Sequence, residues 1–188
     1  MTLYFRLLII LFKILLGPKK HPLDASVTHF RALPTDCDLN LHVTSSRYIE
    51  FMEAATIHFM GQVGILGKLL KRRCFPFNAA HDLTYIRPIK PFEKFSVTTR
   101  VVTWDDKYGY KEQRFEVDGE LRAIGMARAV VVCRGAVVSM GEIAALTGED
   151  LAAPHAPETV LKWKDLLEAK KTPPSQYRPE PASDFVFY

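Results

Sequence analysis

The sequence predicts an α+β fold in which an antiparallel sheet packs around one long helix. Two observations predict it. Apolar side chains recur at helical spacing across residues 47–64 and cover most of the helix circumference, as expected for a helix wrapped by a sheet. Further along, residues 76–87, 93–105, 108–117 and 120–134 read as consecutive strands, and Asp118-Gly119 is a strong hairpin signal between the last two.

The last of these strands carries small residues on one face. Ala123, Gly125, Ala127 and Ala129 alternate with larger side chains, and alternate residues of a strand share a face. A bulky element can approach such a face closely. We expect that element to be the central helix.

The remaining predicted elements lie before and after the central helix and these four strands. Residues 25–33 predict a first strand, and residues 34–45 a loop before the central helix, with Ser45 or Ser46 as its cap. Short helices are expected at 142–152 and 157–170, and the Pro-rich stretch from residue 172 predicts an extended or disordered arm. The predicted division is residues 1–20 as an apolar helix, 21–148 as the domain and 149–188 as a C-terminal extension.

The N-terminal stretch from Leu3 to Leu16 is apolar except for Arg6 and Lys13. Fourteen residues of helix span about 21 Å, short of the ~30 Å hydrocarbon core of a bilayer. The two cations lie two turns apart and therefore share one helix face, which predicts peripheral contact with a membrane surface. The alternatives are a helix packed on the domain or at a dimer contact, and a signal peptide or spanning anchor.

Composition and charge narrow the function classes. The chain is 48% hydrophobic and 24% charged, as in ordinary globular proteins, and its net charge of +4 is mild. No dense Lys/Arg run alternates with aromatic residues, so nucleic-acid binding is not expected. Cys37, Cys74 and Cys133 are widely spaced and odd in number, which favours free thiols in a reducing compartment and argues against a structural zinc site.

Residues 35–43 hold the most informative motif. Asp38, Asn40 and His42 occupy every second position, so in an extended segment their side chains share one face. A carboxylate, an amide and an imidazole there can orient water, hold a carbonyl group and move protons. The helix that follows would add free N–H groups and the positive end of its dipole.

Asp-x-Asn-x-His-Val, followed by Tyr48-Ile49, resembles the signature of hotdog-fold thioesterases, and Asp36-Cys37-Asp38 is similar to the opening of the site in the 4-hydroxybenzoyl-CoA thioesterase-like group. The resemblance runs from about residue 27 to 138. It implies a hotdog fold, a homodimer, and hydrolysis of acyl-CoA or acyl-carrier-protein thioesters without cofactor or metal. The free thiols and the N-terminal segment predict a cytoplasmic location with contact to a membrane surface. Thr44 and Ser45 replace an Asn pair of many relatives.

The resemblance also implies residue roles. Asp38 would be the general base or nucleophile, Asn40 and His42 would position water or substrate, and Tyr48, Thr44 and Ser45 would contact the substrate. Each has a structural alternative: Asp38 as a loop residue that bonds backbone amides, His42 as a loop cap, and Tyr48 as a packing residue.

The other ionisable and nucleophilic candidates are expected to have structural roles rather than catalytic ones. Cys37 should point away from the Asp38 side of the segment, and the helix carboxylates Glu50 and Glu53 are expected to be solvated or ion-paired. His81 and Asp82 are expected to form a pair at a sheet edge. A basic cluster follows the central helix and consists of Lys68, Lys71, Arg72 and Arg73. We interpret these cations as stabilising the negative end of the helix dipole rather than as binding the phosphates of coenzyme A.

Two rival functions remain at this point. A non-catalytic hotdog protein would bind acyl groups or act as a membrane-associated scaffold, which the replaced Asn pair and the N-terminal segment favour. A hotdog dehydratase is the third possibility, although those sites usually place His in a different setting.

Overall fold

The computed structural model describes residues 2–171, and within them the strands form one six-stranded antiparallel sheet. The neighbour order is β1-β3-β4-β5-β2, and the short β6 also pairs with β5. The elements are α1 (Thr2–Leu16), β1 (Ser26–Arg31), η1 (Pro34–Asp36), α2 (Ser45–Gln62), α3 (Leu66–Arg72), β2 (Cys74–Tyr85), β3 (Lys94–Trp104), β4 (Gly109–Val117), β5 (Glu120–Cys133), β6 (Ala136–Val138), α4 (Met140–Ala145) and α5 (Glu158–Ala169). Two compact units divide between His155 and Ala156, and α5 belongs to the second.

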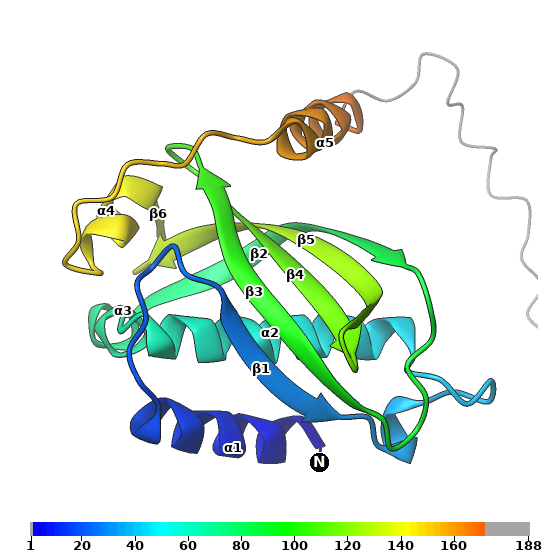
Figure 1. The fold of residues 1–188 in the computed structure, drawn as a ribbon. Helices are drawn as coiled ribbons and strands as arrows, with labels where there is room; N and C mark the ends of the chain where they lie inside the picture. The colour runs from blue at the N-terminus through cyan, green and yellow to red at the C-terminus, as the bar shows by residue number, and fades with distance from the viewer. Residues whose placement is uncertain (1, 172–188) are drawn as a thin grey trace, which may run out of the picture. The chain divides into compact units, whose positions relative to one another are not determined.

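The sheet curls around α2, as Figure 1 shows. Phe51, Met52 and Ala55 of the helix are buried in one cluster with Ala123 and Ala127 of β5. The approach is closest at β5, where a Cβ built on Gly125 would lie 2.7 Å from the Cε of Met52. The prediction that the small face of this strand meets the central helix is therefore confirmed.

Polar contacts fix the helix to the sheet at defined points. The Gln113 amide of β4 donates to the Met52 carbonyl at 2.8 Å, and the Thr28 hydroxyl of β1 pairs with the His58 ring at 2.9 Å. These groups are buried, where an unpaired polar atom would cost about 1–3 kcal/mol, so the pairs set the position of the helix on the sheet.

The N-terminal helix α1 lies beside α2 (Figure 1) and buries one face against it. A Cβ on Gly61 of α2 would lie 2.5 Å from the Ile14 side chain, so Gly61 permits this close approach. The Arg6 side chain is bound to the buried Asp36 carboxylate instead of sharing a free face with Lys13. Among the described residues, no helix is both long and apolar enough to cross a membrane.

Two expectations about the chain are corrected. Cys74 and Cys133 form a disulfide, because β2 and β5 are paired in a register that places these residues opposite one another; only Cys37 is free. The structure also adds α3 and β6, for which no element was predicted, and α4 spans Met140–Ala145 instead of the predicted 142–152. The predicted Pro-rich arm from residue 172 lies outside the described residues.

Candidate active site

The motif residues lie in a tight loop rather than an extended segment. Cys37 and Val43 form an isolated antiparallel bridge, and the Leu41 N–H donates to the Asp38 carbonyl at 3.0 Å. Leu41 has φ 55°, a left-handed conformation that non-glycine residues seldom adopt. The prediction that Asp38, Asn40 and His42 share one face of an extended segment is therefore wrong. The loop instead brings Asp38 next to His42 and leaves Asn40 exposed at its tip.

Asp38 and His42 form the polar pair of the loop. The Oδ1 atom of Asp38 lies 2.8 Å from the His42 Nδ1 and accepts the Asn40 N–H at 2.9 Å. Desolvation acts to raise the pKa of Asp38, but the hydrogen bonds from Asn40 and His42 outweigh it, and the net pKa is lowered. The Asp38 carboxylate is therefore ionised at neutral pH. The His42 backbone N–H also hydrogen-bonds to this carboxylate and helps to lower its pKa.

Helix α2 begins directly after this loop. Thr44 is its N-cap residue, instead of the predicted Ser45 or Ser46, which lie inside the helix. Thr44 makes no side-chain capping bond, and its N–H donates to the Asp36 carbonyl at 3.0 Å. Within the described chain, the N–H groups of Ser45 and Ser46 donate to no backbone carbonyl. These free amides, at the positive end of the helix dipole, can bind an oxyanion.

A cavity of about 470 Å³ joins the pair to the helix start, and Asp38, His42, Thr44, Ser45 and Tyr48 all line it. Five of the six predicted site residues are thus brought together. The sixth, Asn40, does not line the cavity and contributes its backbone N–H to Asp38 instead.

Tyr48 is a packing residue with one side on the cavity. It is buried, and its ring makes edge contacts with Tyr85 at 5.1 Å and Phe115 at 5.0 Å between centroids. Burial raises the pKa of Tyr48 to about 12, so its phenol stays protonated at neutral pH.

The opposite wall of the cavity was missed by sequence reasoning. It consists of residues 85–88, from the end of β2 into the loop before β3, and this loop is tied to the motif because the Val43 N–H donates to the Ile89 carbonyl at 2.9 Å. Arg87 on this wall pairs with Glu120 at 3.1 Å. Pro88 and Pro91 marked a loop here, but nothing in the sequence placed it against residues 36–44.

Two nucleophile candidates are used elsewhere. The Cys37 thiol contacts the Leu33 carbonyl at 3.5 Å and does not line the cavity, as predicted. Burial, with the adjacent carboxylates of Asp36 and Asp38, raises the pKa of the Cys37 thiol, which disfavours the thiolate. Glu50 is ion-paired with Arg47, as expected.

The remaining polar candidates also lie away from the cavity. Glu53 is exposed on α2, and His81 and Asp82 lie on β2, at the edge of the sheet. Burial and the Lys111 cation lower the pKa of His81. The basic cluster on and after α3 lines neither this cavity nor the larger one beside α1, and its Lys68 donates to the Leu146 carbonyl at 2.6 Å. Within residues 2–171, no group of three His, Cys, Asp or Glu side chains is placed to hold a metal ion.

Comparisons with known proteins agree with this fold. The Drosophila melanogaster protein THEM6 is 26% identical over 153 residues, covering 80% of this chain and 77% of the relative. A solved Thermus thermophilus hypothetical protein, TT1821, matches with a TM-score of 0.61 at 23% identity, over 65% of this chain and 97% of that one. A Staphylococcus aureus protein solved in complex with CoA, SAV2348, matches with a TM-score of 0.61 at 13% identity, over 76% and 95% of the two chains.

The family comparison covers most of the domain. The model of the thioesterase-like superfamily matches residues 32–164, which include the motif loop, α2 and strands β2 to β6. The antiparallel sheet curled around α2 is the hotdog arrangement that the motif implied. This chain therefore belongs to the thioesterase-like superfamily and has its hotdog fold.

Proposed function

We propose that this chain hydrolyses acyl thioesters, with Asp38 as the general base or nucleophile. The observation that carries the proposal is the placement of an ionised carboxylate, an imidazole and free helix amides around one cavity. Family membership supports thioester hydrolysis in general. The roles of the individual residues rest on the geometry.

The proposed reaction uses the two ends of the cavity. The thioester carbonyl oxygen would accept hydrogen bonds from the free amides at the start of α2, beginning with that of Ser45, which stabilise the negative charge of the tetrahedral intermediate. A carboxylate oxygen of Asp38 would attack the carbonyl carbon and expel the thiolate, leaving a mixed anhydride that water hydrolyses. Alternatively, Asp38 would take a proton from an attacking water, and the C–S bond would break as the thiolate leaves with that proton. His42 would hold the carboxylate in position through Oδ1.

The proposed substrate is an acyl-CoA or an acyl-carrier protein. The S. aureus protein SAV2348, whose fold is similar, was solved in complex with CoA. In this chain Arg87 lies at the cavity and is 61% exposed, so a phosphate group of the substrate could compete with Glu120 for its guanidinium.

A second copy of the chain is proposed to complete the site. Strand β2 is a sheet edge with exposed aromatic side chains, Phe75 and Phe77, and its C-terminal end leads into the cavity wall. The motif loop exposes Leu39 fully and Leu41 largely. Exposed apolar side chains on an open edge strand favour pairing with another chain. Sedimentation at micromolar concentration should give twice the 21.4 kDa chain mass, and a monomer with full activity would refute the dimer.

Peripheral membrane contact is proposed through the free face of α1. This face exposes Leu8, Leu11, Phe12, Leu15 and Leu16, whereas Arg6 is bound to Asp36 and cannot serve the lipid headgroups. An apolar helix face with nearby lysines suits an anionic interface. Wild-type protein should sediment with anionic vesicles and be released by carbonate, and a variant with Leu11→Asp and Phe12→Asp should stay in solution. Equal sedimentation of both would refute this contact.

The alternative function is non-catalytic acyl binding. Two observations favour it. The Asn40 side chain is exposed and does not reach the cavity. The Asp38 Oδ1 atom accepts a backbone N–H, as structural aspartates in loops commonly do. A screen of acyl-CoAs of graded chain length, following release of the CoA thiol, separates the two functions. Turnover that selects a range of chain lengths supports hydrolysis, whereas saturable binding without thiol release supports the alternative.

A further inference from the structure

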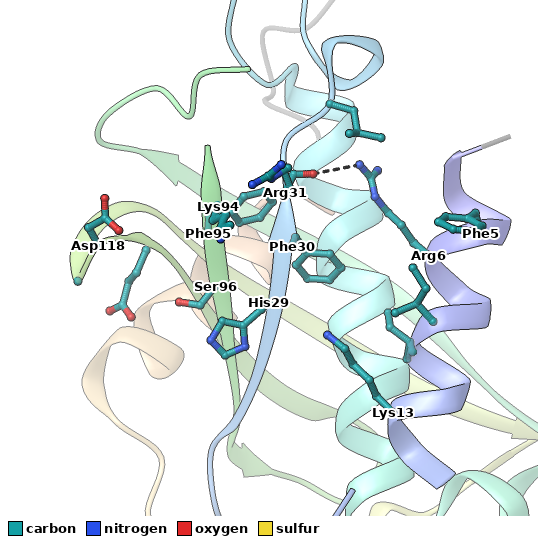
Figure 2. A pocket seen from close by; sticks show the side chains of 15 residues that line it. Phe5, Arg6, Lys13, His29, Phe30, Arg31, Lys94, Phe95, Ser96 and Asp118 are labelled. Carbon is teal, nitrogen blue, oxygen red and sulfur yellow. Dashed lines mark hydrogen bonds between the residues drawn. The ribbon is translucent and has the colours of Figure 1, made fainter. Parts of the chain in front are cut away.

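A second and larger cavity lies between α1 and the sheet edge formed by β1. Its volume is about 650 Å³, within the ~300–1,000 Å³ range of small-molecule sites, and it extends over β3 to the β4–β5 turn. Figure 2 shows it from close by, with the side chains of α1 on one side and those of β1 and β3 on the other. It shares no lining residue with the candidate active site.

One part of this cavity is apolar. Ile9 and Phe5 of α1 present hydrocarbon and aromatic surface to it, whereas the ring of Phe30, which also lines it, packs against Phe51 and Phe95. Ile9 is 41% exposed and Phe5 is 66% exposed, so this surface is still in contact with water. Covering it would release about 25 cal/mol for each Å² of apolar area removed from water.

Another part carries cations that form no ion pair within the described residues. Arg31 and Lys94 are directly opposite each other in the register of β1 and β3, and like charges in that arrangement repel. In the described part of the chain, neither residue forms an ion pair, nor does Lys13, which also lines the cavity. The nearby carboxylates of Glu116 and Asp118 lie beyond ion-pairing distance of all three.

We propose that this cavity binds the anion of a single-chain fatty acid. The carboxylate would lie between Arg31 and Lys94, relieving their repulsion, and the hydrocarbon chain would cross the edge strand β1 toward Ile9 and Phe5 of α1. The exposed apolar side chains further along α1, from Leu11 to Leu16, would give the chain a path from a lipid phase. The site does not require that the protein hydrolyses thioesters.

Isothermal titration calorimetry of the full chain with dodecanoate below its micelle concentration tests the site. Dodecanoate should bind, and dodecanol and dodecyltrimethylammonium, with the same chain but a neutral or cationic head, should bind much more weakly. Lys94→Glu should weaken dodecanoate binding by about tenfold or more, because it removes a charge-assisted contact and gives Arg31 an intramolecular partner. Arg31→Gln is a second variant with the same expected direction.

Two matched controls separate this cavity from other surfaces. Lys71→Glu makes the same charge change on α3, away from the cavity, and should leave binding unchanged. Ile9→Gln should weaken binding, whereas Leu8→Gln on the neighbouring exposed position of α1 should not.

Several results would overturn the proposal. Equal binding of the three head groups would show a purely apolar surface. Equal losses for Ile9→Gln and Leu8→Gln would show adsorption to the outer face of α1. Binding that Lys94→Glu leaves intact would place the carboxylate elsewhere, including the Asp38 cavity, and tighter binding of a two-chain anionic phospholipid would replace the fatty acid as the ligand.

Discussion

The ion pair between Arg6 and Asp36 ties the N-terminal helix to the loop that carries the candidate active site. The Asp36 side chain is 0% exposed and that of Arg6 is 11% exposed. The Arg6 guanidinium donates to both carboxylate oxygens, with Nη1 2.9 Å from Oδ1, and it also lies 4.6 Å from the Phe51 ring centroid. Asp36 immediately precedes the bridge residue Cys37 and accepts the Thr44 N–H through its carbonyl.

Replacing Arg6 with Met should destabilise the fold strongly. Removing one partner of a buried pair costs about 3–5 kcal/mol because the other charge is left buried. Asp36 would retain the Leu33 N–H at 2.8 Å and Arg47, whose Nε lies 3.8 Å away. We therefore expect a loss of about 3 kcal/mol, the lower end of that range, and a Tm lower by roughly 6–12 °C for a chain of this size.

A double-mutant cycle measured by urea unfolding is the assay. Arg6→Met and Asp36→Asn should each destabilise, and the double variant should lose less than the sum by about 1 kcal/mol or more, because the two side chains are in contact. Lys13→Met on the same helix is the control, with an expected change within about 0.5 kcal/mol. Unchanged stability of Arg6→Met, or zero coupling in the cycle, would refute the docking of α1 on the motif loop.

Three other predictions follow from the fold. Ala127→Leu should overpack the contact with α2 and cost ~1–3 kcal/mol of unfolding free energy, whereas Ala79→Leu at the exposed β2 bulge should be neutral; equal Tm values for the two would contradict this packing. Reducing the Cys74–Cys133 disulfide should lower the free energy of unfolding by about 2–4 kcal/mol. Reductant should therefore lower the Tm of the wild-type protein but not that of a double variant with Cys74→Ser and Cys133→Ser. Burial lowers the pKa of Lys111 to about 8, so the unfolded chain binds this proton more tightly and stability should rise with pH from 8 toward the ordinary lysine value of about 10.4. Lys111→Met should remove that rise and increase the Tm at pH 7, and a rise of the same size in the variant would rule out Lys111 as its source.

The predictable part of the fold rests on local patterns. The small face of β5 and the stripe of α2 each repeat at the period of their own element, so the sequence alone identified both and their contact. The motif located Asp38, His42 and the start of α2 for the same reason, since they lie within ten residues of one another.

The unpredicted part depends on contacts between distant segments. Cys74 and Cys133 are 59 residues apart and meet only because of strand register, which cysteine counting ignores. Arg6 reaches Asp36 across 30 residues. The loop that closes Asp38 onto His42 depends on a left-handed Leu41, a conformation that sequence rules assign to Gly or Asn.

The most direct test of the central claim is the kcat of an Asp38→Asn variant for acyl-CoA hydrolysis. Asn keeps the size of the side chain but cannot attack the carbonyl or accept the proton, so kcat should fall by ~10²-fold or more. Asp24→Asn, at an exposed turn outside the cavity, should hydrolyse at the wild-type rate. An Asp38→Asn protein that retains the wild-type Tm and the wild-type kcat would contradict the assignment of Asp38 as the catalytic carboxylate.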